Sequence, residues 1–100
     1  MLMHLPIVIL VYLPFTLVAD TLPKFDIARE CQSEGGAKPS KAFLEKCAED
    51  EAKARDQLPP VWSQSSAADR LSCVKETSMD GTPSYVELLT CLEMTVGPMK

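Results

Sequence analysis

The stretch that decides the fold is Pro83-Ser84-Tyr85-Val86-Glu87-Leu88-Leu89-Thr90-Cys91-Leu92-Glu93-Met94. Its large apolar residues recur at the spacing of one face of an α-helix. These residues are Tyr85, Leu88, Leu89 and Leu92. Ser84 followed three residues later by Glu87 is a capping box, which predicts that the helix begins at Ser84. Gly97-Pro98 predicts its end.

The same design occurs twice upstream of this helix. A serine that can cap a helix precedes a cysteine by seven residues three times: Ser40 and Cys47, Ser66 and Cys73, Ser84 and Cys91. Seven residues are about two helical turns, so the three cysteines are expected at a similar depth in three helices. A shorter first helix is expected around Phe25 to Cys31, ending at Gly35-Gly36.

The two middle helices have weaker patterns. The helix that begins at Ser40 is expected to run to about Leu58, where Pro59-Pro60 breaks or kinks it. The helix that begins at Ser66 carries Ala67, Leu71 and Val74 on its expected apolar face. Since no alternating strand pattern is found, the sequence predicts an all-α fold, a small bundle of three to four short helices arranged as two hairpins.

The four cysteines, Cys31, Cys47, Cys73 and Cys91, favour a disulfide framework in an exported chain. Antiparallel hairpins bring together residues at equal distance from the turn. We therefore favour Cys31–Cys47 and Cys73–Cys91, two disulfides that would each staple one hairpin. The alternative is the nested pairing, Cys47–Cys73 with Cys31–Cys91, which would pin the hairpins to each other.

The N-terminal residues 1–19 contain no Asp, Glu, Lys or Arg. Their apolar run is short for a bilayer span and fits the core of a signal peptide, with cleavage after Ala19. We expect export to the periplasm or secretion; the alternative is an uncleaved inner-membrane anchor. Residues 20–100 then form a single small helical domain, which would meet the membrane only through residues 1–19.

The charge pattern and the residue types restrict the chemistry. With 14 acidic against 10 basic residues, nucleic-acid binding is not expected. The only histidine, His4, lies in the N-terminal segment, which removes the common histidine-based triads and metal sites from the domain. The cysteine spacing fits neither a zinc site nor a redox motif. We therefore expect no catalytic residue, no metal and no cofactor.

Carboxylates are concentrated on the second helix, at Glu45, Glu49, Asp50, Glu51 and Asp56. On one helix they are expected to be a solvated face. Glu51 lies within the apolar stripe, and we expect it to extend from the edge of a thin domain towards water. The alternative is a buried functional carboxylate. Trp62, the only tryptophan, is expected to cap the core.

The segments 47–58, 62–64 and 83–94, together with Asp69-Arg70 and Cys73, resemble a family of short uncharacterised exported proteins of rhizobial-type bacteria. The resemblance implies a shared helical fold and no activity. The family usually remains helical where this chain has Pro59-Pro60. Leu58, Trp62 and Cys73 are also distantly similar in spacing to the N-terminal domain of LprI-type lysozyme inhibitors.

These observations favour a non-enzymatic binding or envelope-associated protein, whose partner would be an envelope protein. One alternative is an inhibitor of a cell-wall enzyme. Another is a small carboxylate-dependent hydrolase that uses Glu51. A third is an acid-response protein whose acidic helix is neutralised at low pH.

Overall fold

The computed structural model describes residues 21–97, which fold as four α-helices with no strand among them. The helices are α2 (Ile27–Glu34), α3 (Lys41–Gln64), α4 (Ala67–Thr77) and α5 (Tyr85–Val96). The all-α prediction is confirmed. Residues 1–19, the predicted signal segment or anchor, lie outside the described residues. None of the described helices is long and apolar enough to cross a bilayer.

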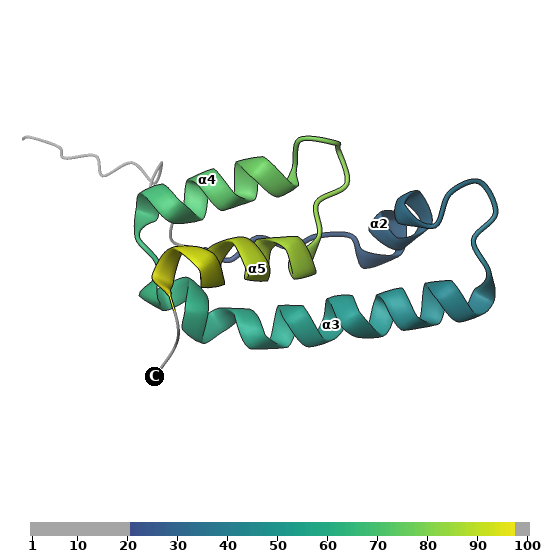
Figure 1. The fold of residues 1–100 in the computed structure, drawn as a ribbon, viewed down its shortest axis with the longest axis horizontal. Helices are drawn as coiled ribbons and strands as arrows, with labels where there is room; N and C mark the ends of the chain where they lie inside the picture. The colour runs from purple at the N-terminus through teal and green to yellow at the C-terminus, as the bar shows by residue number, and fades with distance from the viewer. Residues whose placement is uncertain (1–20, 98–100) are drawn as a thin grey trace, which may run out of the picture.

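The helices form two antiparallel hairpins, α2–α3 and α4–α5, as Figure 1 shows. α5 lies between α3 and α4, and α2 packs on the N-terminal half of α3. Each hairpin contains one disulfide, Cys31–Cys47 in the first and Cys73–Cys91 in the second. This is the favoured pairing. Each bridge closes a loop of modest length, which stabilises the fold by roughly 3 kcal/mol in the chain-entropy model.

Every helix begins with a side-chain cap on a backbone N–H. The serines behave as the sequence predicts: Ser40, Ser66 and Ser84 accept from the backbone N–H three residues later. Asp26 does the same for α2, a cap that the sequence reading did not identify. Such a cap contributes about 1 kcal/mol because it gives a partner to an N–H that has none within the helix.

α3 differs from its predicted extent. It continues through Pro59 and Pro60 to Gln64, so the predicted end near Leu58 is wrong. Both prolines are exposed on the helix surface, where the carbonyl groups that they leave without a donor can meet water. Leu58 and Trp62, on either side of the prolines, are both buried in the core. Their burial offsets the lost hydrogen bonds and keeps the chain helical.

The core lies where α3, α4 and α5 meet. It is made of Ala54, Leu58, Val61, Trp62, Cys73, Tyr85, Leu88, Leu89 and Leu92. The predicted apolar face of α5 is therefore correct, and Trp62 is a core residue as expected. The predicted face of α4 is correct for Val74, which packs against the core, and wrong for Ala67 and Leu71, which are exposed. The buried residues of α4 are Cys73 and Thr77. α4 packs mainly on α5, its Arg70 also contacts Trp62 of α3, and the Cys73–Cys91 disulfide holds Cys73 on the inner face.

Glycine is required at the end of α2. A Cβ on Gly35 would lie 2.5 Å from the Cβ of Pro39 and 2.8 Å from the ring of Phe43. Gly36 follows with a φ of +83°, a conformation that side chains other than glycine rarely adopt. The predicted stop at Gly35-Gly36 is confirmed, and it brings α3 back alongside α2.

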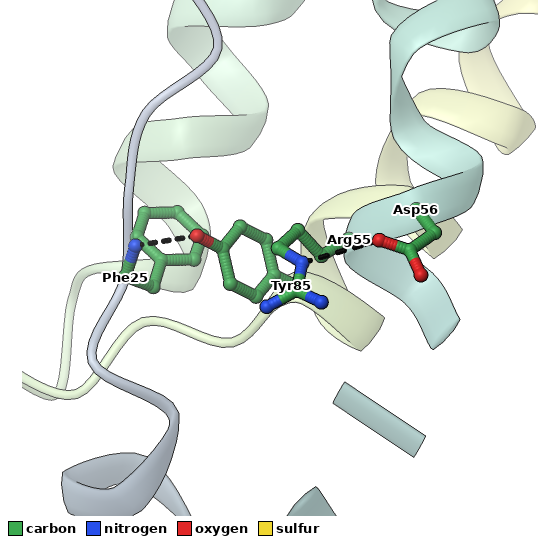
Figure 2. A network of polar contacts seen from close by, with 4 residues as sticks. All are labelled: Phe25, Arg55, Asp56 and Tyr85. Carbon is green, nitrogen blue, oxygen red and sulfur yellow. Dashed lines mark hydrogen bonds and ion pairs between the residues drawn. The ribbon is translucent and has the colours of Figure 1, made fainter. Parts of the chain in front are cut away.

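Tyr85 ties the segment that precedes α2 to the start of α5. Its hydroxyl oxygen accepts a hydrogen bond from the backbone N–H of Phe25 at 2.8 Å, and the two rings lie 4.8 Å apart between centroids (Figure 2). Figure 2 also shows the exposed Arg55–Asp56 pair of α3. The Phe25–Tyr85 contact joins two parts of the chain that are 60 residues apart.

Tyr85→Phe should destabilise the domain by about 1 kcal/mol, because it removes one half-buried hydrogen bond and keeps the ring. We expect the Phe25 amide to lose most of its protection in hydrogen-exchange NMR, while amides in the middle of α5 keep theirs. Unchanged protection of the Phe25 amide would contradict the assigned hydrogen bond.

Candidate functional site

Glu51 is buried at the junction of the two hairpins. It projects from α3 and is only 3% exposed. One carboxylate oxygen accepts from the hydroxyl of Ser84 at 2.5 Å, and the other accepts from the backbone N–H of Tyr85 at 2.6 Å. A carboxylate is stabilised at a helix N-terminus, where N–H groups without helical partners and the helix dipole favour negative charge. The prediction that Glu51 extends towards water is wrong, because α5 supplies the donors that allow it to be buried.

The contacts of Glu51 continue into α4. The backbone N–H of Ser84 donates to the Thr77 hydroxyl oxygen at 3.0 Å, and that hydroxyl donates to a carboxylate oxygen of Glu87 at 2.7 Å. The predicted capping box is thus completed through Thr77, with no direct bond from Ser84 N–H to Glu87 among the contacts of the described residues. This network joins the end of α4 to the start of α5 and both to α3.

A second pair of carboxylates lies against the first disulfide. One oxygen of Glu30 is 3.8 Å from the sulfur of Cys47, and one oxygen of Glu34 is 3.9 Å from the same sulfur. A disulfide sulfur carries no hydrogen, so these are contacts and cannot be donated hydrogen bonds. Glu30 is only 4% exposed, whereas Glu34 is exposed.

Burial raises the pKa of Glu30 from its ordinary 4.5 to about 7, and the nearby charges of Glu34, Glu51 and Glu87 add to the effect. A carboxyl group with such a pKa is partly protonated at neutral pH. Glu30 is not among the carboxylates predicted from the sequence, which all lie on the acid-rich second helix. The signal available was a glutamate directly beside a cysteine in a short amphipathic helix.

Glu30, Cys31 and Cys47 come close enough together to resemble a metal site, with one potential ligand atom from each within 4.8 Å of the others. Both cysteines are joined in the disulfide, however, and metal binding by cysteine requires the thiolate. This trio therefore does not offer the thiolate ligands that a zinc site needs.

An open groove lies between α2 and α3, beside Cys31 of the first disulfide. Its volume is about 410 Å³, and its lining residues are Ala28, Cys31, Gln32, Lys41, Leu44, Glu45 and Ala48. The α2 residues are spaced by three and four positions, as are those of α3, so each set forms one helix face. The small side chains of Ala28 and Ala48 leave the space, and the lining is mainly apolar. Cys31 lines the groove, while its partner Cys47 contacts the two carboxylates.

The other acidic residues of α3 do not form a site. Glu45, Glu49 and Asp56 are exposed, and Asp50 is half-buried. Three ion pairs, all solvent-accessible, occur here: Lys41–Glu45, Lys46–Asp50 and Arg55–Asp56. Pairs of this kind contribute little to stability. Except for Glu51, this side of α3 is the solvated face that the sequence predicts.

Trp62 is a buried part of the core, and its backbone carbonyl accepts from the Nε of Arg70 at 2.9 Å. The guanidinium of Arg70 also lies 5.2 Å from the centre of the indole ring. This cation–π contact covers the ring at the surface of the domain. Trp62 therefore has the structural role predicted for it.

Comparison with protein-family models, with curated proteins and with solved structures gives no match to this chain. The resemblances described from the sequence stay predictions, and the site is interpreted from its own geometry.

Glu51→Ala should destabilise the domain by about 3 kcal/mol, because it leaves the N–H of Tyr85 and the hydroxyl of Ser84 buried without their acceptor. Glu51→Gln keeps one acceptor oxygen and should cost about half as much. Urea unfolding followed by circular dichroism measures both. The matched control is Glu49→Gln on the exposed face of α3. A loss below about 0.5 kcal/mol in Glu51→Ala would contradict the capping role.

Glu30 should make the domain more stable at mildly acidic pH than at alkaline pH. Because its pKa is higher in the folded state, the folded protein binds the proton more tightly. This contribution is complete below about pH 4.5 and is lost as the pH rises through about 7. We expect Glu30 to add about 1 to 2 kcal/mol to the unfolding free energy at pH 5.5 relative to pH 8.

The control for this effect is Glu30→Gln, in which the contribution should disappear because the amide does not titrate. The quantity to compare is the difference in unfolding free energy between the two proteins at each pH, since other carboxylates titrate in both. Parallel pH profiles for the two proteins would show that Glu30 does not have a raised pKa.

Proposed function

We propose that this protein is an exported, non-enzymatic binding protein that holds a small apolar molecule in the groove between α2 and α3. The observation that carries the proposal is the groove itself, whose volume of about 410 Å³ lies in the range of small-molecule sites. Its floor is apolar, and Gln32, Lys41 and Glu45 supply polar groups at the rim. Such a lining favours a ligand with an apolar body and one polar end.

The first disulfide supports a preformed site. Cys31–Cys47 joins the two helices that line the groove, and Gly35 sets the tight return between them. A site whose walls are already fixed loses little conformational entropy on binding. The two disulfides are also compatible with an oxidising compartment outside the cytoplasm, which fits the expected export.

The surroundings of Glu51 favour a binding protein over the hydrolase alternative. Both of its oxygens accept hydrogen bonds from the start of α5, and its side chain is buried away from the groove residues. A general acid or base must reach the proton that it transfers. Glu51 is instead engaged in holding the hairpins together.

The test uses the fluorescent apolar probe N-phenyl-1-naphthylamine, which is uncharged near neutral pH. Ala48→Leu places a larger side chain in the groove and should weaken probe binding by roughly tenfold or more, a change of about 1.4 kcal/mol. The matched control is Ala42→Leu, the same substitution at an exposed position of α3 outside the groove lining. Fluorescence titration measures both affinities.

Nuclear magnetic resonance of the alanine methyl groups locates the probe. Shifts concentrated at Ala28 and Ala48 would support the groove as the site. Failure of the wild-type protein to bind the probe, or equal weakening by Ala48→Leu and Ala42→Leu, would overturn the proposal.

A further inference from the structure

The two carboxylates beside the first disulfide have an unusual set of neighbours. Oxygens of Glu30 and Glu34 both approach the sulfur of Cys47, at 3.8 and 3.9 Å. That sulfur has no hydrogen to donate to either of them. Glu30 is buried at this contact, so its ionised form carries an electrostatic cost, to which the nearby charge of Glu34 adds.

Among the described residues, the charged groups that act on the pKa of Glu30 include no cation. The ionisable groups that act on Glu30 are Glu34 on α2 itself, Glu51 on α3 and Glu87 on α5, and all are acidic. The hydrogen bonds of Glu51 go to the start of α5, and Glu87 accepts from Thr77. The interior behind α2 therefore repels further negative charge.

The second hairpin provides a comparison within the same molecule. Glu34 follows Cys31 by three residues, and Glu76 follows Cys73 by three. Glu76 places an oxygen 3.4 Å from the sulfur of Cys91, as Glu34 does with the sulfur of Cys47. Glu76 is exposed, and the position before Cys73 is Ser72, so the second hairpin has no counterpart of Glu30. Of the two disulfides, only the one beside the groove has a buried carboxyl against it.

We propose that Glu30 and Glu34 form a proton-binding site that controls the α2 wall of the groove. With the proton bound, α2 packs on α3 and the groove keeps its shape. When the proton leaves, the ionised carboxylate of Glu30 beneath α2 weakens the packing of α2 on α3, while the Cys31–Cys47 bridge keeps the two helices together. The groove then binds its apolar ligand more weakly, which is the one step that rests on the proposed function.

The link between the two sites is Cys31. Glu30 and Glu34 lie four residues apart on one face of α2, and the groove residues Ala28 and Gln32 lie four apart on the neighbouring face. Cys31 borders both faces, because it lines the groove and is bonded to the sulfur that the carboxylates contact. A movement of α2 caused by ionisation on the carboxylate face therefore also displaces the groove residues on the neighbouring face.

The first experiment needs no ligand. Carbon-13 NMR of glutamate carboxyls should show Glu30 titrating near pH 7, and Glu34→Gln should change its midpoint. Hydrogen exchange, corrected for the intrinsic effect of pH, should show α2 amides losing protection by roughly tenfold between pH 6 and pH 8 while α4 amides do not. Glu30→Gln should keep α2 protected at pH 8. Glu76→Gln is the matched change at the second disulfide. In this variant the α2 amides should lose protection between pH 6 and pH 8 as they do in the wild type.

A Glu30 midpoint below pH 5, or α2 protection that does not depend on pH, would overturn the proton-binding site whatever the groove binds. The second experiment repeats the N-phenyl-1-naphthylamine titration at pH 6 and pH 8. We expect affinity to fall by roughly tenfold in the wild type and to stay constant in Glu30→Gln. Binding that is equal at both pH values would overturn the coupling. Absence of binding at every pH would instead overturn the proposed function and leave the carboxyl titration as the test of the proton site.

Discussion

The fold depends on one buried carboxylate at a helix N-terminus. Glu51 of α3 accepts from the first two polar groups of α5, and no disulfide joins the two hairpins. The α3–α5 interface must therefore be specified by non-covalent contacts alone. Leu58 and Leu88 supply apolar area there, but apolar packing tolerates sliding. The carboxylate allows one register, because a shift of a single turn would leave a charge and an N–H buried without partners.

Much of this fold can be predicted from the sequence, because it depends on patterns between residues that are close together along the chain. The serine caps, the stop at Gly35-Gly36 and the apolar face of α5 depend on residues three or four positions apart. The same information favours the observed disulfides over the nested pairing, since residues at similar distances from a turn are neighbours in a hairpin. The predictions that are wrong concern features that depend on tertiary contacts. Pro59 and Pro60 stay inside α3 because the residues around them are buried by α5, which no local rule includes.

The candidate site was the least predictable part. Glu51 is conspicuous in the sequence as a charged residue within an apolar stripe. Its role, however, depends on Ser84 and Tyr85, which are more than 30 residues away. Glu30 has an ordinary sequence position, and its raised pKa arises from burial, to which acidic side chains on three helices add. The groove is lined from both helices of a hairpin, with the small side chains of Ala28 on α2 and Ala48 on α3 among its walls. Residue spacing predicts which face of a helix a residue occupies. The size of a groove between two helices depends on how the helices pack against each other.

The placement of both bridges within hairpins also affects how the chain can assemble. Each hairpin is closed by its own disulfide. The only covalent link between the two hairpins is the short connection at Ser65 and Ser66 between α3 and α4. Separating them breaks no covalent bond and exposes matching surfaces of α3 and α5. A hairpin released from its own partner can dock on the equivalent surface of a second molecule. The architecture therefore has a direct route to a domain-swapped dimer, in which Glu51 of one chain would cap α5 of the other.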